Sequence, residues 1–210
     1  MQLVTTKPGI IVAENDRELA ETSRTEIQSI IGNFPDCYVE LGSGSGMHLI
    51  RLADRSPNAL CIGLEIRFKR AFKTGEKAEG KSLDNIRVLR TDARQIRHLF
   101  SPGQVSAFFI NYPDPWEKRR WRKNRLINAE LVKTMWELLK PGGFFRYKTD
   151  HQEYFASTCP LLTPDKWEIQ RHTTDLLQSP FMENNIPTEF EMLFKSQGKP
   201  LCLVEAIKRG

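Results

Sequence analysis

Short apolar runs alternate with amphipathic stretches through the middle of this chain. The apolar runs are rich in Val, Ile, Leu and Phe, a pattern typical of strands that are buried on both faces. They predict strands at Cys37–Leu41, Ala59–Leu64, Ile86–Leu89, Val105–Ile110 and Phe144–Lys148. The intervening stretches carry apolar residues at helical spacing and predict helices at Gly46–Ala53, Arg67–Ala78, Ala93–Leu99 and Leu126–Leu139.

This alternation of strands and helices predicts the fold class. Each strand-helix-strand unit places its two strands in parallel, so we expect a mostly parallel α/β sheet with helices on both faces, a Rossmann-like arrangement. Lys140-Pro141-Gly142-Gly143 follows the last of these helices and predicts its end.

The two ends of the chain follow different patterns. Residues 15 to 31 have helical apolar spacing with Asn15 as a cap, and Gly32 to Asp36 then breaks the pattern. We therefore expect a helical N-terminal appendage over residues 1–35 and one further domain over residues 36–210. Near the other end, Trp167–Arg171 and Leu201–Ile207 predict two strands of an antiparallel hairpin.

Composition excludes some classes of protein. The 210 residues are 40% hydrophobic with a net charge of +5, which suits a globular domain and permits an RNA partner without requiring one. The apolar runs are too short to cross a membrane. Three of the four cysteines, Cys37, Cys61 and Cys202, lie in or beside apolar runs, which predicts free buried thiols and a reducing compartment. We expect a cytoplasmic protein with no metal and no membrane association.

A glycine-rich turn follows the first predicted strand. Glycines let the backbone turn sharply and approach a ligand closely, at the edge where open α/β sheets bind ligands. A dinucleotide turn needs Gly-x-Gly-x-x-Gly, but here Gly42 and Gly44 are followed by Gly46, and Met47 fills the dinucleotide position. The carboxylate of Glu40 suits the cationic sulfonium and amino groups of S-adenosylmethionine. The pattern therefore favours that cofactor over a nicotinamide dinucleotide.

Two further acids follow the next two predicted strands. Glu65 is placed to accept hydrogen bonds from ribose hydroxyls, and Asp92 to meet the adenine amino group. The alternatives are that Asp92 is a helix N-cap and that Glu40 is a solvated strand residue. Three acids at three successive strand ends favour a cofactor site.

The segment after the fourth predicted strand carries candidate chemistry. Pro113 and Pro115 restrict the backbone around Asp114 and present its carboxylate at the lip of the expected cleft. Trp116 offers a flat face on which a planar base can stack. Six basic residues follow within Lys118 to Arg125. A solvated helix start is one interpretation, but cations there oppose the helix dipole, so we favour a surface that contacts RNA phosphates.

These motifs together resemble the TrmB family of tRNA (guanine-N7-)-methyltransferases. The resemblance covers roughly residues 36 to 207 and rests on Glu40 to Gly46, Pro113 to Trp116, Pro141 to Gly143, Thr149-Asp150 and Thr188-Glu189-Phe190-Glu191. Glu117 and Trp121 depart from the family, which has Pro-Lys or Pro-Arg and then histidines in the basic run.

The resemblance implies a class I S-adenosylmethionine-dependent methyltransferase fold and a set of site residues. The residues around S-adenosylmethionine would be Glu40, Gly42, Gly44, Gly46, Glu65, Asp92 and Asp114. The target guanosine would contact Lys118, Asp150, Thr188, Glu189, Phe190 and Glu191. The expected substrate is the guanine at position 46, in the variable loop of tRNA.

The chemistry of guanine N7 shapes the expected mechanism. The N7 lone pair needs no deprotonation, so positioning matters more than a general base. We expect Asp114 to orient the guanine and stabilise its growing charge, with Asp150 and Glu191 as candidates for its Watson–Crick edge. A turn-forming Asp150 and a surface Glu191 are the alternatives.

Three rival functions remain open from the sequence. The first is a Rossmann-fold methyltransferase acting on another nucleic-acid base or exocyclic amine, because Asn111-Tyr112-Pro113-Asp114 loosely resembles an amino-methyltransferase motif. The second is a nicotinamide-dependent dehydrogenase, and the third is a non-catalytic RNA-binding protein. We expect a monomer or a homodimer.

Overall fold

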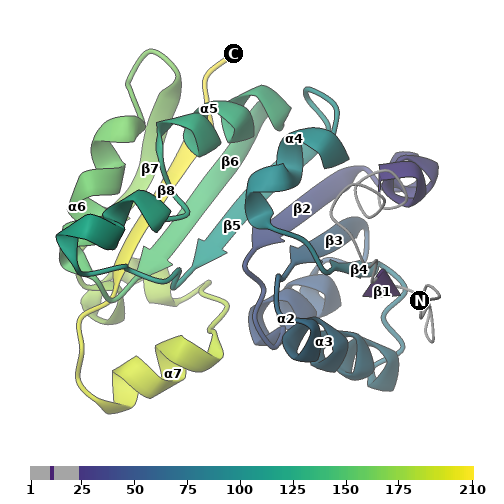
Figure 1. Ribbon diagram of the computed structural model, residues 1–210, viewed down its shortest axis with the longest axis horizontal. Helices are drawn as coiled ribbons and strands as arrows, with labels where there is room; N and C mark the ends of the chain where they lie inside the picture. The colour runs from purple at the N-terminus through teal and green to yellow at the C-terminus, as the bar shows by residue number, and fades with distance from the viewer. Residues whose placement is uncertain (1–9, 12–23) are drawn as a thin grey trace.

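One mixed sheet organises the protein, whose computed structural model describes residues 10–11 and 24–210. The strands lie in the order β1-β4-β3-β2-β5-β6-β8-β7 (Figure 1). Neighbours from β1 to β6 pair in parallel, whereas β8 pairs antiparallel with both β6 and β7. The strand bounds are β1 Ile10–Ile11, β2 Asp36–Leu41, β3 Ala59–Leu64, β4 Ile86–Leu89, β5 Val105–Asn111, β6 Leu139–Thr149, β7 Trp167–Thr173 and β8 Cys202–Lys208.

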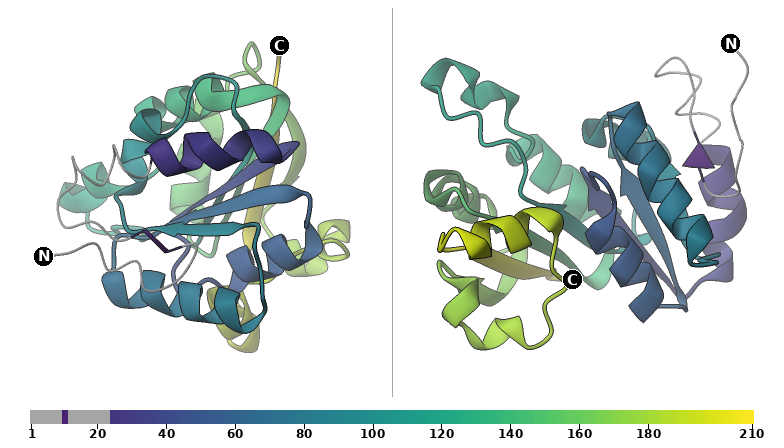
Figure 2. Two further views of the ribbon diagram at one scale, coloured as in Figure 1. Left: turned by 90° about the vertical axis from the view of Figure 1, so that its right-hand side faces the viewer. Right: turned by 90° about the horizontal axis from the view of Figure 1, so that it is seen from below.

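Helices cover both faces of this sheet. Figure 2, left, shows residues 24–30, α4 and α5 on one face and α2 and α3 on the other. The α-helices are α2 Met47–Arg55, α3 Phe68–Gly80, α4 Ile96–Leu99, α5 Ala129–Leu138, α6 Gln152–Thr158 and α7 Glu189–Ser196. Short 3₁₀ helices are η1 Ile31–Asn33, η2 Ala93–Gln95, η3 Arg119–Asn124, η4 Cys159–Leu161, η5 Leu176–Gln178 and η6 Pro180–Met182. In the described part of the chain, we find no helix with the length and apolar character that crossing a membrane requires.

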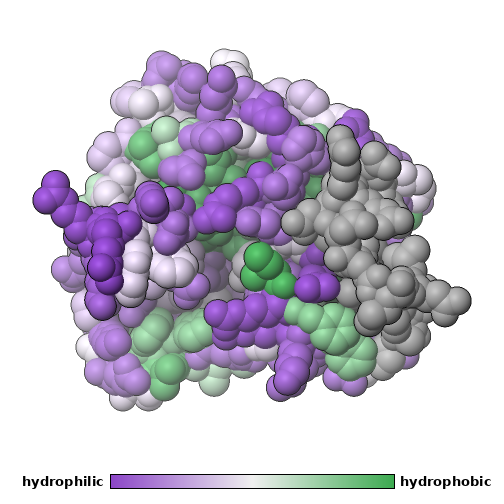
Figure 3. Space-filling view, in the orientation of Figure 1, coloured by the Kyte–Doolittle hydropathy of each residue, from purple (hydrophilic) through white to green (hydrophobic). Residues whose placement is uncertain are grey.

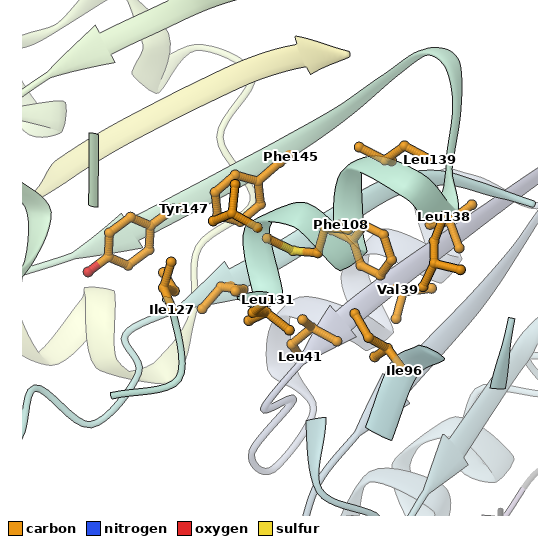
Figure 4. Close-up of a cluster of buried hydrophobic side chains, with 14 of the residues drawn as sticks. Val39, Leu41, Ile96, Phe108, Ile127, Leu131, Leu138, Leu139, Phe145 and Tyr147 are labelled. Carbon is orange, nitrogen blue, oxygen red and sulfur yellow. The ribbon is translucent and has the colours of Figure 1, made fainter. Parts of the chain in front are cut away.

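The core consists of two main clusters, one on each side of the sheet. Every residue of β3 and β5 is buried, as expected for strands with helices on both faces. The larger cluster fills the space between the sheet and α4, α5 and α6, and Figure 4 shows Phe108, Leu131 and Phe145 within it. The smaller cluster lies under α2 and α3. The predicted Rossmann-like fold is therefore confirmed.

The predicted boundary between the long helix and the fifth strand differs from the structure. β6 begins at Leu139, directly after α5, and the residues from Lys140 to Gly143 form a bulge where the register with β5 shifts. Gly142 has a φ of +73°, a conformation that glycine adopts without strain and that allows this bulge. At the N-terminal side, residues 24–30 of the predicted helix are helical, whereas residues 15 to 23 lie outside the described residues.

The described residues before β2 pack on the rest of the protein. β1 pairs with β4, and Ile27 is fully buried in the larger core cluster.

The C-terminal part contains the predicted antiparallel pair of strands and a helix that the sequence did not predict. α7 lies between β7 and β8 along the chain, and Thr188 caps it by accepting a hydrogen bond from the Glu191 amide. Met192 and Leu193 are about half exposed on this helix, so its apolar residues do not follow the pattern of one buried face. α7 nevertheless matters for function because its first turn lies at the cleft described next.

Candidate active site

A cleft of about 350 Å³ opens at the carboxyl ends of β2, β3, β4 and β5. This is the edge at which open α/β sheets bind ligands. Ten predicted site residues line the cleft, namely Glu40, Gly42, Gly44, Gly46, Glu65, Asp92, Asp114, Thr188, Glu189 and Phe190. Three others lie outside its lining, namely Lys118, Asp150 and Glu191.

The glycine turn forms the floor of the cleft between β2 and α2. Gly42, Gly44 and Gly46 have φ angles of +80°, +59° and +83°, which explains why glycine is needed at each. A Cβ at Gly42 or Gly44 would meet nothing within 4 Å, so the turn leaves open space above it. A Cβ at Gly46 would lie 2.3 Å from Cγ2 of Thr74, because this glycine packs directly on α3.

Glu40 is a buried carboxylate, 2% exposed, on the wall of the cleft. Its Oε1 accepts a hydrogen bond of 2.8 Å from Asn111 and lies 3.2 Å from Nδ1 of His48. Its Oε2 has no hydrogen-bond partner among the described residues. A buried carboxylate oxygen without a partner is costly, and a cationic ligand in the cleft would satisfy it. The alternative of a solvated strand residue is therefore wrong for Glu40.

Glu65 and Asp92 both have local partners as well as a place in the lining. Glu65 accepts hydrogen bonds from the amides of Gly44, at 3.0 Å, and Arg67, at 2.8 Å, and so holds the glycine turn against β3. Asp92 caps η2 by accepting from the Arg94 amide at 2.9 Å. The N-cap alternative for Asp92 is correct, but a carboxylate accepts several hydrogen bonds, so the cap does not preclude ligand binding.

The loop after β5 presents Asp114 at the mouth of the cleft. Asp114 is exposed, whereas β5 below it is fully buried. Tyr112 and Trp116 flank the loop with φ angles of +51° and +44°, unusual values for residues with side chains. Arg125 fixes the loop, because its Nε donates a hydrogen bond of 2.9 Å to the Pro115 carbonyl oxygen. Strained, externally held backbone of this kind concentrates at functional sites.

The residues from Lys118 to Arg125, here called the basic arm, follow this loop. η3 occupies most of the arm, and α5 begins later, at Ala129, with Asn128 as its cap. The residues from Lys118 to Lys123 are exposed and begin a 3₁₀ helix, so the structure agrees with the alternative of a solvated helix start, and RNA contact by the arm stays a prediction. The arm lies beside α6 in Figure 1, and Figure 3 shows hydrophilic side chains gathered at that edge. Trp121 packs edge-to-face on Trp116 at 6.3 Å.

The segment from Thr188 to Phe190 closes the cleft from the side of α7. Glu189 accepts hydrogen bonds from the Ser45 hydroxyl and from Lys77 Nζ, the latter at 3.3 Å. These hydrogen bonds, first that of Ser45 and then that of Lys77, hold the pKa of the Glu189 carboxyl below its ordinary value. The contact places the first turn of α7 against the glycine turn.

Glu191 and Asp150 both lie outside the cleft lining. Glu191 is 2% exposed, and its Oε2 lies 2.7 Å from Nζ of Lys148 in a buried ion pair. The surface alternative is thus also wrong for Glu191. Oδ2 of Asp150 lies 3.9 Å from Nζ of Lys199, and Asp150 is not part of the cleft lining. Lys148 directly precedes the Thr149-Asp150 pair of the resemblance, but that motif does not include it, and sequence reasoning missed it.

The cysteines among the described residues are free thiols. Cys37, Cys61 and Cys202 are buried, as predicted, and burial raises the pKa of Cys61 to about 12. Within residues 10–11 and 24–210, no group of three or more His, Cys, Asp or Glu side chains is arranged to hold a metal ion.

Comparisons with known proteins agree with this geometry. Residues 34–204 match the family Methyltransf_4, described as "Putative methyltransferase". The chain is 32% identical over 94% of its length to a tRNA (guanine-N(7)-)-methyltransferase of Lachnoclostridium phytofermentans, 93% of which is covered. It is 37% identical to a bifunctional glycosyltransferase/methyltransferase of Fusobacterium nucleatum, matching 89% of this chain but 29% of that longer protein.

A solved structure supports the fold. A Streptococcus mutans protein crystallised in complex with SAH superposes with a TM-score of 0.57 at 14% sequence identity, covering 94% of this chain and 99% of that one.

Proposed function

Because the chain belongs to the TrmB family of tRNA (guanine-N7-)-methyltransferases, we propose that it methylates the guanine at position 46 in the variable loop of tRNA. The enzyme uses S-adenosylmethionine to methylate N7 of guanine in tRNA. The observation that best supports methyl transfer in this cleft is that Glu40 and Asp114 both line it, the first as a buried carboxylate with a free oxygen and the second as an exposed carboxylate.

The residues of the cleft fit S-adenosylmethionine. The free oxygen of Glu40 suits its amino group, and the open space above Gly42 and Gly44 admits the ligand close to the backbone. Glu65 and Asp92 would hold the ribose hydroxyls and the adenine amino group. When bound, the cofactor supplies a methyl group on a cationic sulfur, which makes that carbon electrophilic.

The protein's own contribution is orientation. Guanine N7 already has an in-plane lone pair, so no residue needs to remove a proton from it before transfer. Asp114 holds the guanine at the mouth of the cleft and stabilises the positive charge that it acquires. Phe190, which is partly exposed in the lining, offers a ring on which the base can rest.

The geometry favours revised roles for Lys118 and Glu191. Lys118 lies on the basic arm, where it would contact tRNA phosphate rather than the reacting guanine. Glu191 would pair with Lys148 rather than bind the Watson–Crick edge, because both are buried together.

Neutralising cations of the basic arm should weaken tRNA binding and should make that binding less dependent on salt concentration. The variant combines Lys118→Gln, Arg119→Gln and Lys123→Gln. The logarithm of the tRNA binding constant falls as the logarithm of the salt concentration rises, and we expect the variant to make this slope less steep by about 0.7 to 0.9 for each phosphate that the arm no longer binds. Titration of tRNA at several salt concentrations measures the slope. The control is Lys81→Gln. Lys81 is an exposed cation at the C-terminal cap of α3, and its replacement should leave the slope unchanged. An unchanged slope in the triple variant would refute the assignment of the arm to phosphate contact.

The function is tested with labelled S-adenosylmethionine and unmodified tRNA, followed by mass spectrometry of the nucleosides. We expect label in N7-methylguanosine from wild-type tRNA and none from a transcript with adenine at position 46. Label in N7-methylguanosine from both would overturn the position. Label in a neutral product such as N6-methyladenosine would instead support a methyltransferase that acts on an exocyclic amine.

A further inference from the structure

Lys148 is a charged residue in the interior of the protein. It lies on β6 with 1% of its surface exposed. Its Nζ donates to Glu191 Oε2 at 2.7 Å, to Asn185 Oδ1 at 3.0 Å and to the Ile186 carbonyl oxygen at 2.9 Å. An ammonium has three hydrogens, so the three hydrogen bonds of Nζ account for all of them, and each is directed at the segment that leads into α7 or at α7 itself.

The backbone of the same residue contacts the loop that carries Asp114. The carbonyl oxygen of Lys148 accepts a hydrogen bond of 2.8 Å from the amide of Tyr112. Tyr112 has a φ of +51° and directly precedes Pro113 and Asp114, so this hydrogen bond fixes the start of the loop that carries Asp114. The Tyr112 ring also packs on Phe194 of α7, with centroids 5.6 Å apart.

One residue of β6 therefore joins two walls of the cleft. Its side chain holds Glu191, whose amide donates to Thr188, and its main chain holds the loop of Asp114. Stability alone is a weak explanation for this arrangement, because two apolar side chains of similar volume often stabilise a core as well as a buried ion pair does. A buried ion pair differs from an apolar pair in fixing one geometry, with defined donors and acceptors.

We propose that Lys148 is a positioning residue for methyl transfer, which sets the first turn of α7 against the loop of Asp114 through its ion pair with Glu191. This inference rests on the proposed function, because it assigns Asp114 and α7 to the two sides of the reacting guanine. Lys148 does not touch the reactants itself. Replacing Lys148 should therefore lower the rate of the chemical step, because in-line transfer is sensitive to displacements of about 1 Å.

The test compares Lys148→Met, Glu191→Gln and the double variant Lys148→Met/Glu191→Gln. Single-turnover rates at saturating S-adenosylmethionine and tRNA report the chemical step, and calorimetric titration with S-adenosylhomocysteine counts the folded sites. We expect Lys148→Met to lower the single-turnover rate by roughly tenfold to 100-fold per folded site, with the affinity for S-adenosylhomocysteine changed less than about threefold. The double variant removes both charges, so we expect its melting temperature to recover while its rate remains low.

Arg146→Met is the matched control. Arg146 lies two residues earlier on β6 and forms a mostly buried ion pair with Glu205 of β8, and it is outside the cleft lining. This variant should lower the melting temperature without lowering the single-turnover rate per folded site by more than about threefold.

Three results would overturn the proposal. One is an unchanged rate in Lys148→Met, and another is a rate in the double variant that returns together with its melting temperature. The third is an equal loss of rate in Arg146→Met. If Lys148→Met does not fold, the double variant decides the question. A wild-type protein that makes no N7-methylguanosine would instead refute the proposed function, so the two failures are distinguishable.

Discussion

Replacing Asp114 by asparagine should lower the rate of methyl transfer by about 100- to 1,000-fold, as expected when a preorganised group that stabilises developing charge is removed. The side chain keeps its size, so the loop between Pro113 and Pro115 retains its backbone. The variant loses the negative charge beside the guanine. That charge stabilises the base most when the base becomes cationic during transfer. Single-turnover kinetics with saturating tRNA would measure the fall in rate, and titration with S-adenosylhomocysteine would show whether the cofactor site is intact.

Glu117→Gln is the matched control for this prediction. Glu117 is an exposed carboxylate three residues further along the chain and outside the cleft lining. It should retain the wild-type rate. Full turnover by Asp114→Asn, or an equal loss in Glu117→Gln, would remove Asp114 from the reaction.

Replacing Gly46 by alanine should destroy the cofactor site. The residue has a φ of +83°, which costs an alanine about 1–2 kcal/mol, and the added Cβ would lie 2.3 Å from Thr74 Cγ2. Overpacking of this kind costs typically about 1–3 kcal/mol more. Thr74 also donates to the Gly44 carbonyl oxygen at 3.3 Å, so its displacement releases the glycine turn. We expect the affinity for S-adenosylhomocysteine to fall at least about 100-fold, as measured by calorimetry.

Gly103→Ala separates the two causes. Gly103 has a similar φ of +73°, but a Cβ there would meet nothing within 4 Å, and it lies outside the cleft lining. This variant should lose about 1–2 kcal/mol of unfolding free energy and keep its affinity. If Gly46→Ala loses no more stability or affinity than this control, the contact with Thr74 is unimportant.

The central strands were predictable because of where they lie. A parallel strand with helices on both faces must be apolar along its whole length, so β3 and β5 are visible as continuous runs. The glycine turn was predictable for a different reason, since Gly42 and Gly46 adopt conformations that other residues rarely do. In both cases the residue type itself carries the structural information.

The rest of the site depends on contacts that local patterns do not contain. Lys148 and Glu191 lie 43 residues apart, and nothing in the sequence around either indicates that each neutralises the other. The same holds for α7, whose partly exposed Leu193 obscures its buried face. Glu191 was predicted to contact the target guanosine, but its side chain points to Lys148 because burial of one charge requires the other.

The antiparallel insertion of β8 between β6 and β7 affects how the protein is assembled during translation. β7 pairs with β8 and, among the described residues, with no other strand, although β8 is made later. Until the ribosome has released β8, the nascent chain holds β6 with an open edge and β7 without a partner, and open edges invite pairing with other chains. We therefore expect the edge of β6 to stay open to other chains until β8 has been made.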